Sequence, residues 1–183
     1  MEAMNSLDHF NIMVVILCQL VPEIDSVLRE VFENFNFHKE SGLLQFWACS
    51  TDHDSEEIGC NLVLTDLTYN LTQDQGLEDY RNRCLVKQYP LIGMETSVGN
   101  WLAGRAAQTG IADHRTKHYV VDQDDQHSAD VGARGQLVLP VFFDEGAENK
   151  LAGVIEYVTP VRKESYVEDF EQIQNLLKVS SSP

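Results

Sequence analysis

At 183 residues, the chain is long enough for one domain with a proper core, since 43% of its residues are hydrophobic. Its 13 basic and 29 acidic residues give a formal net charge of −16, which would repel a phosphate backbone and argues against direct nucleic-acid binding. The longest apolar run, 12–21, is well short of the roughly 20 residues of a membrane span, and no Lys or Arg precedes it as in a signal peptide. We therefore expect a nuclear or cytoplasmic protein that does not enter a membrane.

The first half of the chain predicts one helix and one hairpin after an N-terminal extension, 1–20. From Pro22, apolar residues recur with the spacing of a helix that buries one face, at Ile24, Val27, Leu28, Val31, Phe32 and Phe35. Two runs rich in strand-forming residues, 43–49 and 61–67, follow as the arms of a hairpin. The acidic loop between them, 51–57, is either a solvated turn or a cation site, although it lacks the glycine and the spacing of a calcium loop.

Two further helices are expected over 73–88 and 98–108. Pro90 and Gly93 end the first, and Gly110 ends the second. The polar, turn-rich segment 111–131 is the expected functional loop, because segments that cross a rigid sheet often carry the ligand contacts.

The last third of the chain predicts a long antiparallel hairpin of 134–143 and 151–158, with a turn at 144–149. Pro140 has no amide hydrogen, so its nitrogen is expected to face an edge or a bulge. Ser165 and Glu168 have the spacing of a capping box and open a final amphipathic helix. The tail, 180–183, is expected to fray. This order of elements indicates an α+β layered domain over 21–179.

Few residues suggest reactive or metal chemistry. The cysteines, Cys18, Cys49, Cys60 and Cys84, form no CxxC pair and are expected to be buried, reduced thiols. His114 and His118 are four residues apart and could share a metal ion on a helix, but Arg115 and Lys117 lie between them and oppose a metal. The sequence contains none of the familiar hydrolase, phosphate-loop or dinucleotide motifs. We therefore expect a non-enzymatic protein with no metal and no cofactor.

Three cationic residues lie close in sequence to the predicted helix and hairpin: Arg105, His127 and Arg134. If their side chains share a cavity, two guanidinium forks and an imidazole could hold a small planar anion. The alternative is that each arginine pairs with one of the abundant carboxylates.

The segment 127–142, with Arg134-Gly135-Gln-Leu-Val-Leu-Pro-Val-Phe142, followed by Leu151-Ala-Gly-Val-Ile-Glu156, resembles the N-terminal GAF-like region of the plant NIN-like (RWP-RK) transcription factors. Upstream, Leu43-Leu-Gln-Phe-Trp-Ala48 and Leu102-Ala-Gly-Arg-Ala106 are similar to that family's first strand and Gly-Arg helix. The resemblance covers roughly 21–179. The family's DNA-binding and PB1 domains have no counterpart here, so the chain is expected to be either an excised domain or a shortened relative.

The resemblance implies a GAF-like fold, a central antiparallel sheet with helices on one face and a ligand cleft on the other. It also implies a sensor module of a nitrate-responsive transcription factor. The expected ligand-binding residues are Trp101, Arg105, Tyr119, His127, Arg134 and Glu156, with nitrate as the candidate ligand. The alternative is a protein-interaction module with a degenerate pocket that forms a homodimer through its terminal helices.

Overall fold

The computed structural model describes residues 21–50, 61–86, 102–117, 132–145 and 148–180. In chain order its elements are α1 (Val21–Asn34), β1 (Leu43–Ser50), β2 (Asn61–Leu71), α2 (Gln75–Val86), α3 (Leu102–Thr109), β3 (Asp113–Arg115), β4 (Gly135–Glu145), β5 (Glu148–Thr159) and α5 (Val167–Ser180). Within these ranges, every predicted helix and strand is present. The structure adds β3, a short strand near the start of the predicted loop 111–131.

The described strands form a five-stranded sheet with the order β2-β1-β5-β4-β3, and every neighbouring pair is antiparallel. The α+β class, a central antiparallel sheet flanked by helices, is therefore confirmed. The predicted C-terminal hairpin is present as β4 and β5. Its turn is shorter than expected, because β4 extends to Glu145 and β5 begins at Glu148.

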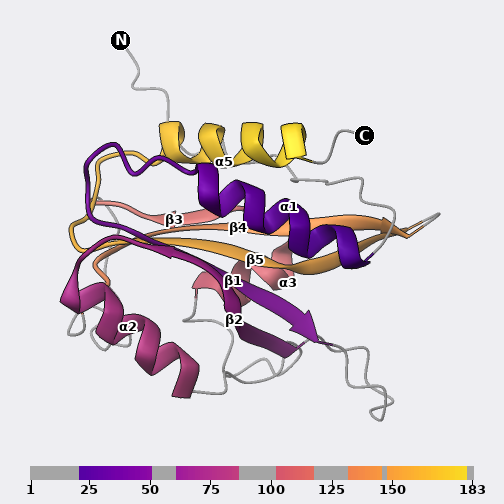
Figure 1. Ribbon diagram of the computed structural model, residues 1–183, viewed down its shortest axis with the longest axis horizontal. Helices are drawn as coiled ribbons and strands as arrows, with labels where there is room; N and C mark the ends of the chain where they lie inside the picture. Colours follow the sequence, from indigo (N-terminus) through magenta and orange to yellow (C-terminus); the bar gives the residue numbers. More distant parts are fainter. Residues whose placement is uncertain (1–20, 51–60, 87–101, 118–131, 146–147, 181–183) are drawn as a thin grey trace.

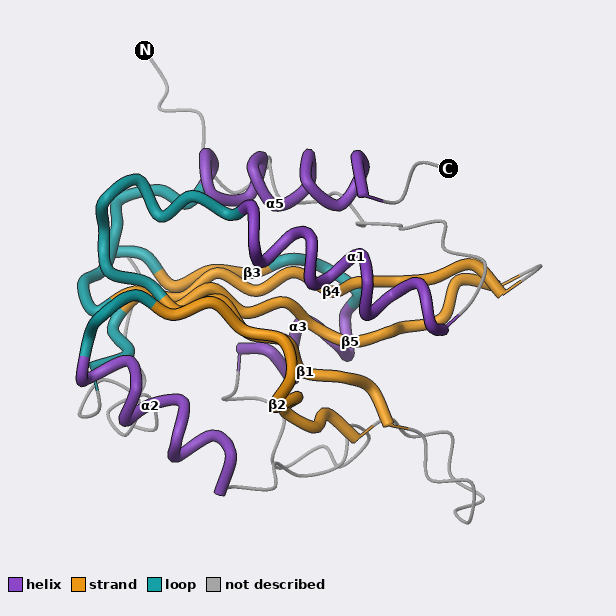
Figure 2. Tube along the Cα trace, viewed as in Figure 1, coloured by secondary structure: helices purple, strands orange, loops and turns teal. Residues whose placement is uncertain are grey.

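Helices cover both faces of the sheet (Figures 1 and 2). α1 and α5 pack on one face, where Leu44, Leu139 and Ile155 lie in the same apolar cluster as Leu28 and Ile173. α2 and α3 cover the opposite face, called here the α2/α3 face, through a second apolar cluster of residues from these helices and from β1, β2, β4 and β5. The expectation of helices on one face alone was wrong, because the two middle helices also bury apolar side chains against the sheet.

The terminal helices turn their apolar stripes to the sheet, as their spacing predicted. Their solvent-facing positions are mostly charged and include Asp25, Arg29, Glu30, Glu33, Glu168, Glu171 and Lys178. Dimerisation through α1 and α5 stays a prediction, and it would require largely polar contacts.

Ser165 lies at the start of α5, and Pro140 lies near a bulge of β4. Ser165 accepts a hydrogen bond from the backbone N–H of Val167, at 3.2 Å, at the start of α5. In the hairpin, Pro140 pairs with Val154 and lies beyond the stretch of β4 that β3 covers, close to a register shift between Val141 and Phe142. A proline is tolerated at such a position because no described strand on that side of β4 calls for its missing N–H.

Gly153, opposite Val141, allows β1 and β5 to approach closely. A Cβ atom at this position would collide with the carbonyl oxygen of Trp47 and the ring of Phe46, and its φ of 157° is one that residues with side chains rarely adopt. Glycine is therefore required where the central strands meet.

Two of the four cysteines lie in the described part. Cys84 is a buried thiol that forms no disulfide, as expected. Cys49 is disulfide-bonded, so the expectation of a reduced thiol was wrong there. Cysteine spacing alone carries no information on pairing, which depends on the fold. No described helix is long and apolar enough to cross a membrane.

Candidate functional site

A row of polar side chains crosses the sheet on the α2/α3 face. Directly paired residues on neighbouring antiparallel strands project from the same face, so the register identifies the members of a row. One row runs through all five strands as Asp113, Val138, Glu156, Gln45 and Tyr69. The next row on this face contains Arg115, Gln136, Val158 and Leu43.

Glu156 is the centre of this arrangement and is fully buried. One carboxylate oxygen accepts hydrogen bonds from Gln45 Nε2, at 2.7 Å, and Trp47 Nε1, at 2.6 Å. The other oxygen accepts from the Tyr80 hydroxyl, at 2.8 Å, and from Gln136 Nε2. Four neutral donors thus fill the acceptor sites of one buried carboxylate and join β1, β4 and β5 to α2.

Arginine side chains lie on both sides of Glu156. Arg81, on α2, donates from Nη1 to Gln45 Oε1 at 3.1 Å, and its guanidinium lies 3.7 Å from the centre of the Tyr69 ring. Towards the other edge of the sheet, Arg105 on α3 forms an ion pair with Asp113 on β3. Arg115, also on β3, is 3% exposed and lies opposite Gln136 in the register of β3 and β4.

Burial of so many polar groups on one face is costly unless each of them is well satisfied. Among the described residues, eight polar or charged residues are buried, and five of them belong to this face: Gln45, Arg81, Arg115, Gln136 and Glu156. The Oε1 atom of Gln136 is buried without a hydrogen-bond partner. Places where a core departs from apolar packing are where function is expected, so we take this network as the candidate site.

The six predicted ligand-binding residues fall into three groups. Glu156 is the buried centre of the network. Arg105 pairs with a carboxylate, Asp113, as the alternative reading of the sequence had it, and the side chain of Arg134 is exposed. Trp101, Tyr119 and His127 lie outside the described residues.

The remaining network residues were missed because nothing in their local sequence marks them. Gln45 and Gln136 lie at strand positions whose side chains point to the α2/α3 face. A glutamine at an inward-facing strand position was the one sign in the sequence that could have identified them. Tyr80 lies within the predicted helix 73–88 and carries no motif of its own, although buried tyrosines usually have a hydrogen-bond partner.

A metal ion shared by His114 and His118 would require both residues to lie on one helix. His114 lies in β3 rather than in a helix, and burial lowers the pKa of its imidazole, opposed by the nearby charge of Asp113. No three His, Cys, Asp or Glu side chains gather as metal ligands in the ranges that the structure describes. His118 and the acidic loop 51–57 lie outside those ranges.

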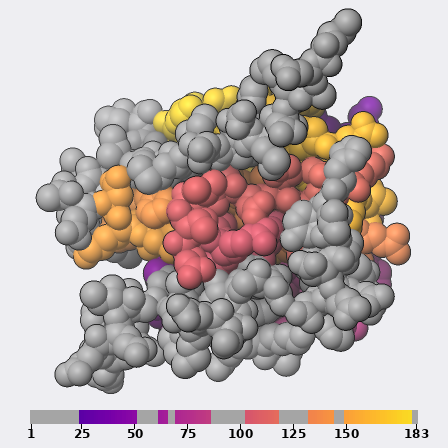
Figure 3. Space-filling view, turned by 180° about the vertical axis from the view of Figure 1, so that it is seen from behind, coloured from indigo at the N-terminus to yellow at the C-terminus, as the bar shows by residue number. Residues whose placement is uncertain are grey.

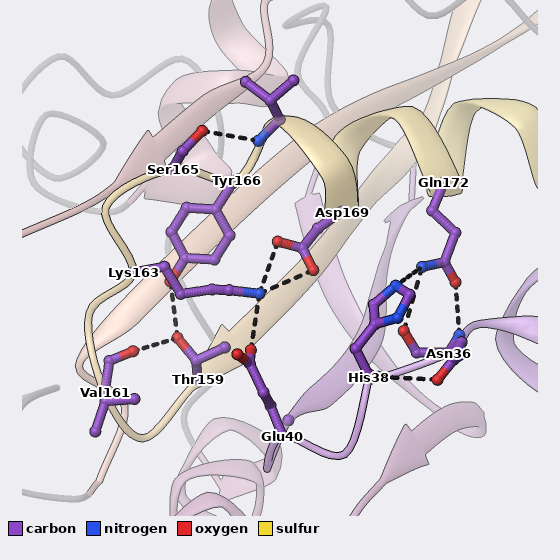
Figure 4. A network of polar contacts seen from close by, with 12 residues as sticks. Asn36, His38, Glu40, Thr159, Val161, Lys163, Ser165, Tyr166, Asp169 and Gln172 are labelled. Carbon is purple, nitrogen blue, oxygen red and sulfur yellow. Dashed lines mark hydrogen bonds and ion pairs between the residues drawn. The ribbon is translucent and has the colours of Figure 1, made fainter.

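A second polar network lies on the opposite face of the sheet, beneath the start of α5 (Figure 4). The ammonium group of Lys163 contacts both carboxylate oxygens of Asp169, at 3.0 and 3.1 Å, and Glu40 at 2.9 Å. The Tyr166 hydroxyl is 2.7 Å from the Thr159 hydroxyl. These contacts fasten the loop after α1 and the loop after β5 to α5, so this network is structural in character.

The buried tyrosines of the second network predict alkaline unfolding. Burial raises the pKa of Tyr166 to about 12 from its ordinary value of 10.0, and it also raises the pKa of Tyr157, whose ring packs edge-on against Tyr166 with the ring centroids 6.0 Å apart. Between these values the unfolded chain releases the phenolic proton while the folded chain keeps it, so stability falls as pH rises from 10 towards 12. The slope is about 1.4 kcal/mol per pH unit for each such group.

We expect Tyr166→Phe to reduce the slope of stability against pH by about 1.4 kcal/mol per pH unit, the contribution of one group, because phenylalanine does not titrate. Urea unfolding at a series of alkaline pH values, followed by circular dichroism, measures it. An identical slope in the parent protein and the variant would contradict the prediction.

No protein-family model matches the chain, and no curated protein matches it in sequence. Several solved structures are similar to it in fold. One is the complex of fRMsr of Staphylococcus aureus with substrate, which is 14% identical in sequence. The match covers 78% of this chain and 71% of the fRMsr chain, with a TM-score of 0.47. A GAF sensor protein from Burkholderia vietnamiensis is also 14% identical. Its match covers 88% of this chain and 90% of the sensor chain, with a TM-score of 0.44.

A third structure, described as the structure of the GAF domain, is 13% identical. The match covers 87% of this chain and 86% of that domain, with a TM-score of 0.44. At these identities the similarities concern the fold and not the chemistry of the chain.

Proposed function

We propose that this chain is a non-enzymatic regulatory domain of GAF-like type that binds a small planar oxyanion on the α2/α3 face. Nitrate is the candidate that the resemblance to the NIN-like proteins suggests. In that role the domain would report the ligand to a DNA-binding domain, in the nucleus or the cytoplasm.

The observation that carries the proposal is the presence of three arginines on this face, in a chain with 13 basic and 29 acidic residues. Arg105 and Arg115 lie at the β3 edge of the sheet, and Arg81 lies on the other side of Glu156. A guanidinium fork matches the two oxygens of a planar anion and holds it with charge-assisted hydrogen bonds. Glu156 does not compete for these cations, because its oxygens are engaged by neutral donors. The guanidinium groups on this face are therefore suited to binding and orienting a planar anion.

The edge of the sheet at β3 is where we place the anion. Arg115 lies in β3, Arg105 contacts Asp113 two residues before it, and Gln136 is opposite Arg115 on the neighbouring strand. Residues 118–131, which include the predicted ligand residues Tyr119 and His127, continue the chain directly from this point.

Calorimetric titration with nitrate tests the proposal. We expect the parent protein to bind at millimolar concentration or below and Arg115→Gln to weaken binding about tenfold, which corresponds to a loss of about 1.4 kcal/mol. Arg29→Gln, at an exposed position of α1 on the other side of the sheet, is the matched control and should bind as the parent does.

Two further variants sharpen the experiment. Arg115→Lys keeps the charge without the fork, so it separates simple charge attraction from bidentate recognition. Arg134→Ala shows whether the exposed arginine before β4 belongs to the site. Absence of heat with the folded parent protein at millimolar nitrate would remove nitrate as the ligand.

A further inference from the structure

The ion pair between Arg105 and Asp113 joins α3 to β3 through two donors of the guanidinium group. Both Nε and Nη2 of Arg105 donate to the same oxygen of Asp113, Oδ2, with the Nε contact at 2.8 Å. The other oxygen, Oδ1, accepts the backbone N–H of His114 at 2.8 Å. The carboxylate is thus held in place by its own strand while it presents one oxygen to the arginine.

This pair is accessible, in contrast to the buried Glu156. The side chains of Arg105 and Asp113 are 34% and 33% exposed. The segment that contains them, α3 and β3, lies at the surface in the middle of the face shown in Figure 3. A small anion from solvent can therefore reach the guanidinium group of Arg105.

We infer that Asp113 is a built-in competitor for the anionic ligand, occupying Arg105 until the ligand displaces it. This inference rests on the proposed function. A carboxylate is a planar group with two negatively charged oxygens, so Asp113 offers Arg105 the same chemistry as nitrate or a small free carboxylate. Because one fork cannot hold both groups in the same geometry, binding of the ligand requires exchange.

The position of Asp113 also makes it an electrostatic barrier. It lies on the same face of β3 as Arg115, two residues away, which is roughly 7 Å along a strand. An anion between the two arginines would be attracted by both guanidinium groups and repelled by Asp113. This residue therefore sets the affinity, and ligand exchange at Arg105 changes the contact that joins α3 to β3.

Asp113→Asn is the direct test, because asparagine keeps the shape and the Oδ1 acceptor for His114 but has no charge. A partly exposed pair contributes up to about 1 kcal/mol, so removal of the competitor should tighten anion binding about fivefold. Nitrate and formate are titrated separately at constant ionic strength, and the two arms distinguish an inorganic oxyanion from a carboxylate ligand. Asp25→Asn, at an exposed position of α1, makes the same change in net charge far from Arg105 and should leave the affinity unchanged.

The outcomes separate the two proposals. Tighter binding by Asp113→Asn than by Asp25→Asn, lost again in the double variant Arg105→Gln/Asp113→Asn, supports the inference. If the parent protein binds an anion and Asp113→Asn binds it equally or more weakly while retaining its circular dichroism spectrum, Asp113 is no competitor and the proposed function survives. If neither folded protein binds either anion, both proposals are overturned.

Discussion

Replacement of Glu156 by glutamine should lower the free energy of unfolding by about 3 kcal/mol, although the two side chains have the same shape. The carboxylate accepts four hydrogen bonds, two at each oxygen, from Gln45, Trp47, Tyr80 and Gln136. A carboxamide would turn one of these acceptors into a donor. The two donors at that oxygen would then face an N–H₂ group and would have to reorient, at a cost of about 1–3 kcal/mol for each donor left unsatisfied.

Urea unfolding followed by far-ultraviolet circular dichroism measures this loss. Glu164→Gln is the matched control, because Glu164 is 77% exposed and contacts only Lys117, at 3.4 Å, among the described residues. We expect its stability to lie within about 0.5 kcal/mol of the parent. Equal stability of the Glu156 and Glu164 variants would show that the buried network contributes nothing to the fold.

The second large effect is expected at Lys163, on the other side of the sheet. Lys163→Met should cost about 3 kcal/mol, since removal of one partner leaves the other as an uncompensated buried charge. The side chain of Asp169 is 4% exposed, whereas Glu40, the other partner, is 52% exposed and can turn to water. The loss should therefore come mainly from Asp169.

Acid should partly restore the Lys163→Met variant. Burial already raises the pKa of Asp169, and loss of Lys163 removes the charge that opposes this effect. A carboxyl group whose pKa is raised in the folded state binds its proton more tightly there, so stability increases as pH falls through the folded pKa towards the ordinary Asp value. The double variant Lys163→Met/Asp169→Asn should be more stable than Lys163→Met at neutral pH.

Lys117→Met provides the control for loss of a lysine, because Lys117 is 56% exposed and its contact with Glu164 is long. Its stability should stay within about 0.5 kcal/mol of the parent. If Lys163→Met unfolds no more easily than Lys117→Met at neutral pH, the contact between Lys163 and Asp169 has no stabilising role.

The secondary structure of this chain could be predicted because it depends on local periodicity. The apolar spacing from Ile24 to Phe35 and the alternation from Gly135 to Phe143 reappear as α1 and β4. β3 was missed because three residues, Asp113–Arg115, are too few to show alternation. It becomes a strand only through its pairing with β4, which is a long-range contact.

The candidate site was harder to predict than the fold, for the same reason. Glu156 was proposed through a family resemblance, whereas its partners Gln45 and Tyr80 lie 111 and 76 residues away in sequence. β1 is buried on both faces, so Gln45 interrupts an apolar run and gives no clean pattern of its own. Only the register of β1 against β5 shows that these groups meet.

The pairing of β1 with β5 also has a consequence for biosynthesis. The centre of the sheet joins segments that leave the ribosome at very different times. Gln45 cannot bond to Glu156 until 111 more residues have been synthesised. Until then β1 has an open edge and Trp47 lacks its buried partner. A nascent chain of this topology should fold late and remain exposed to chaperones and proteases for most of its synthesis.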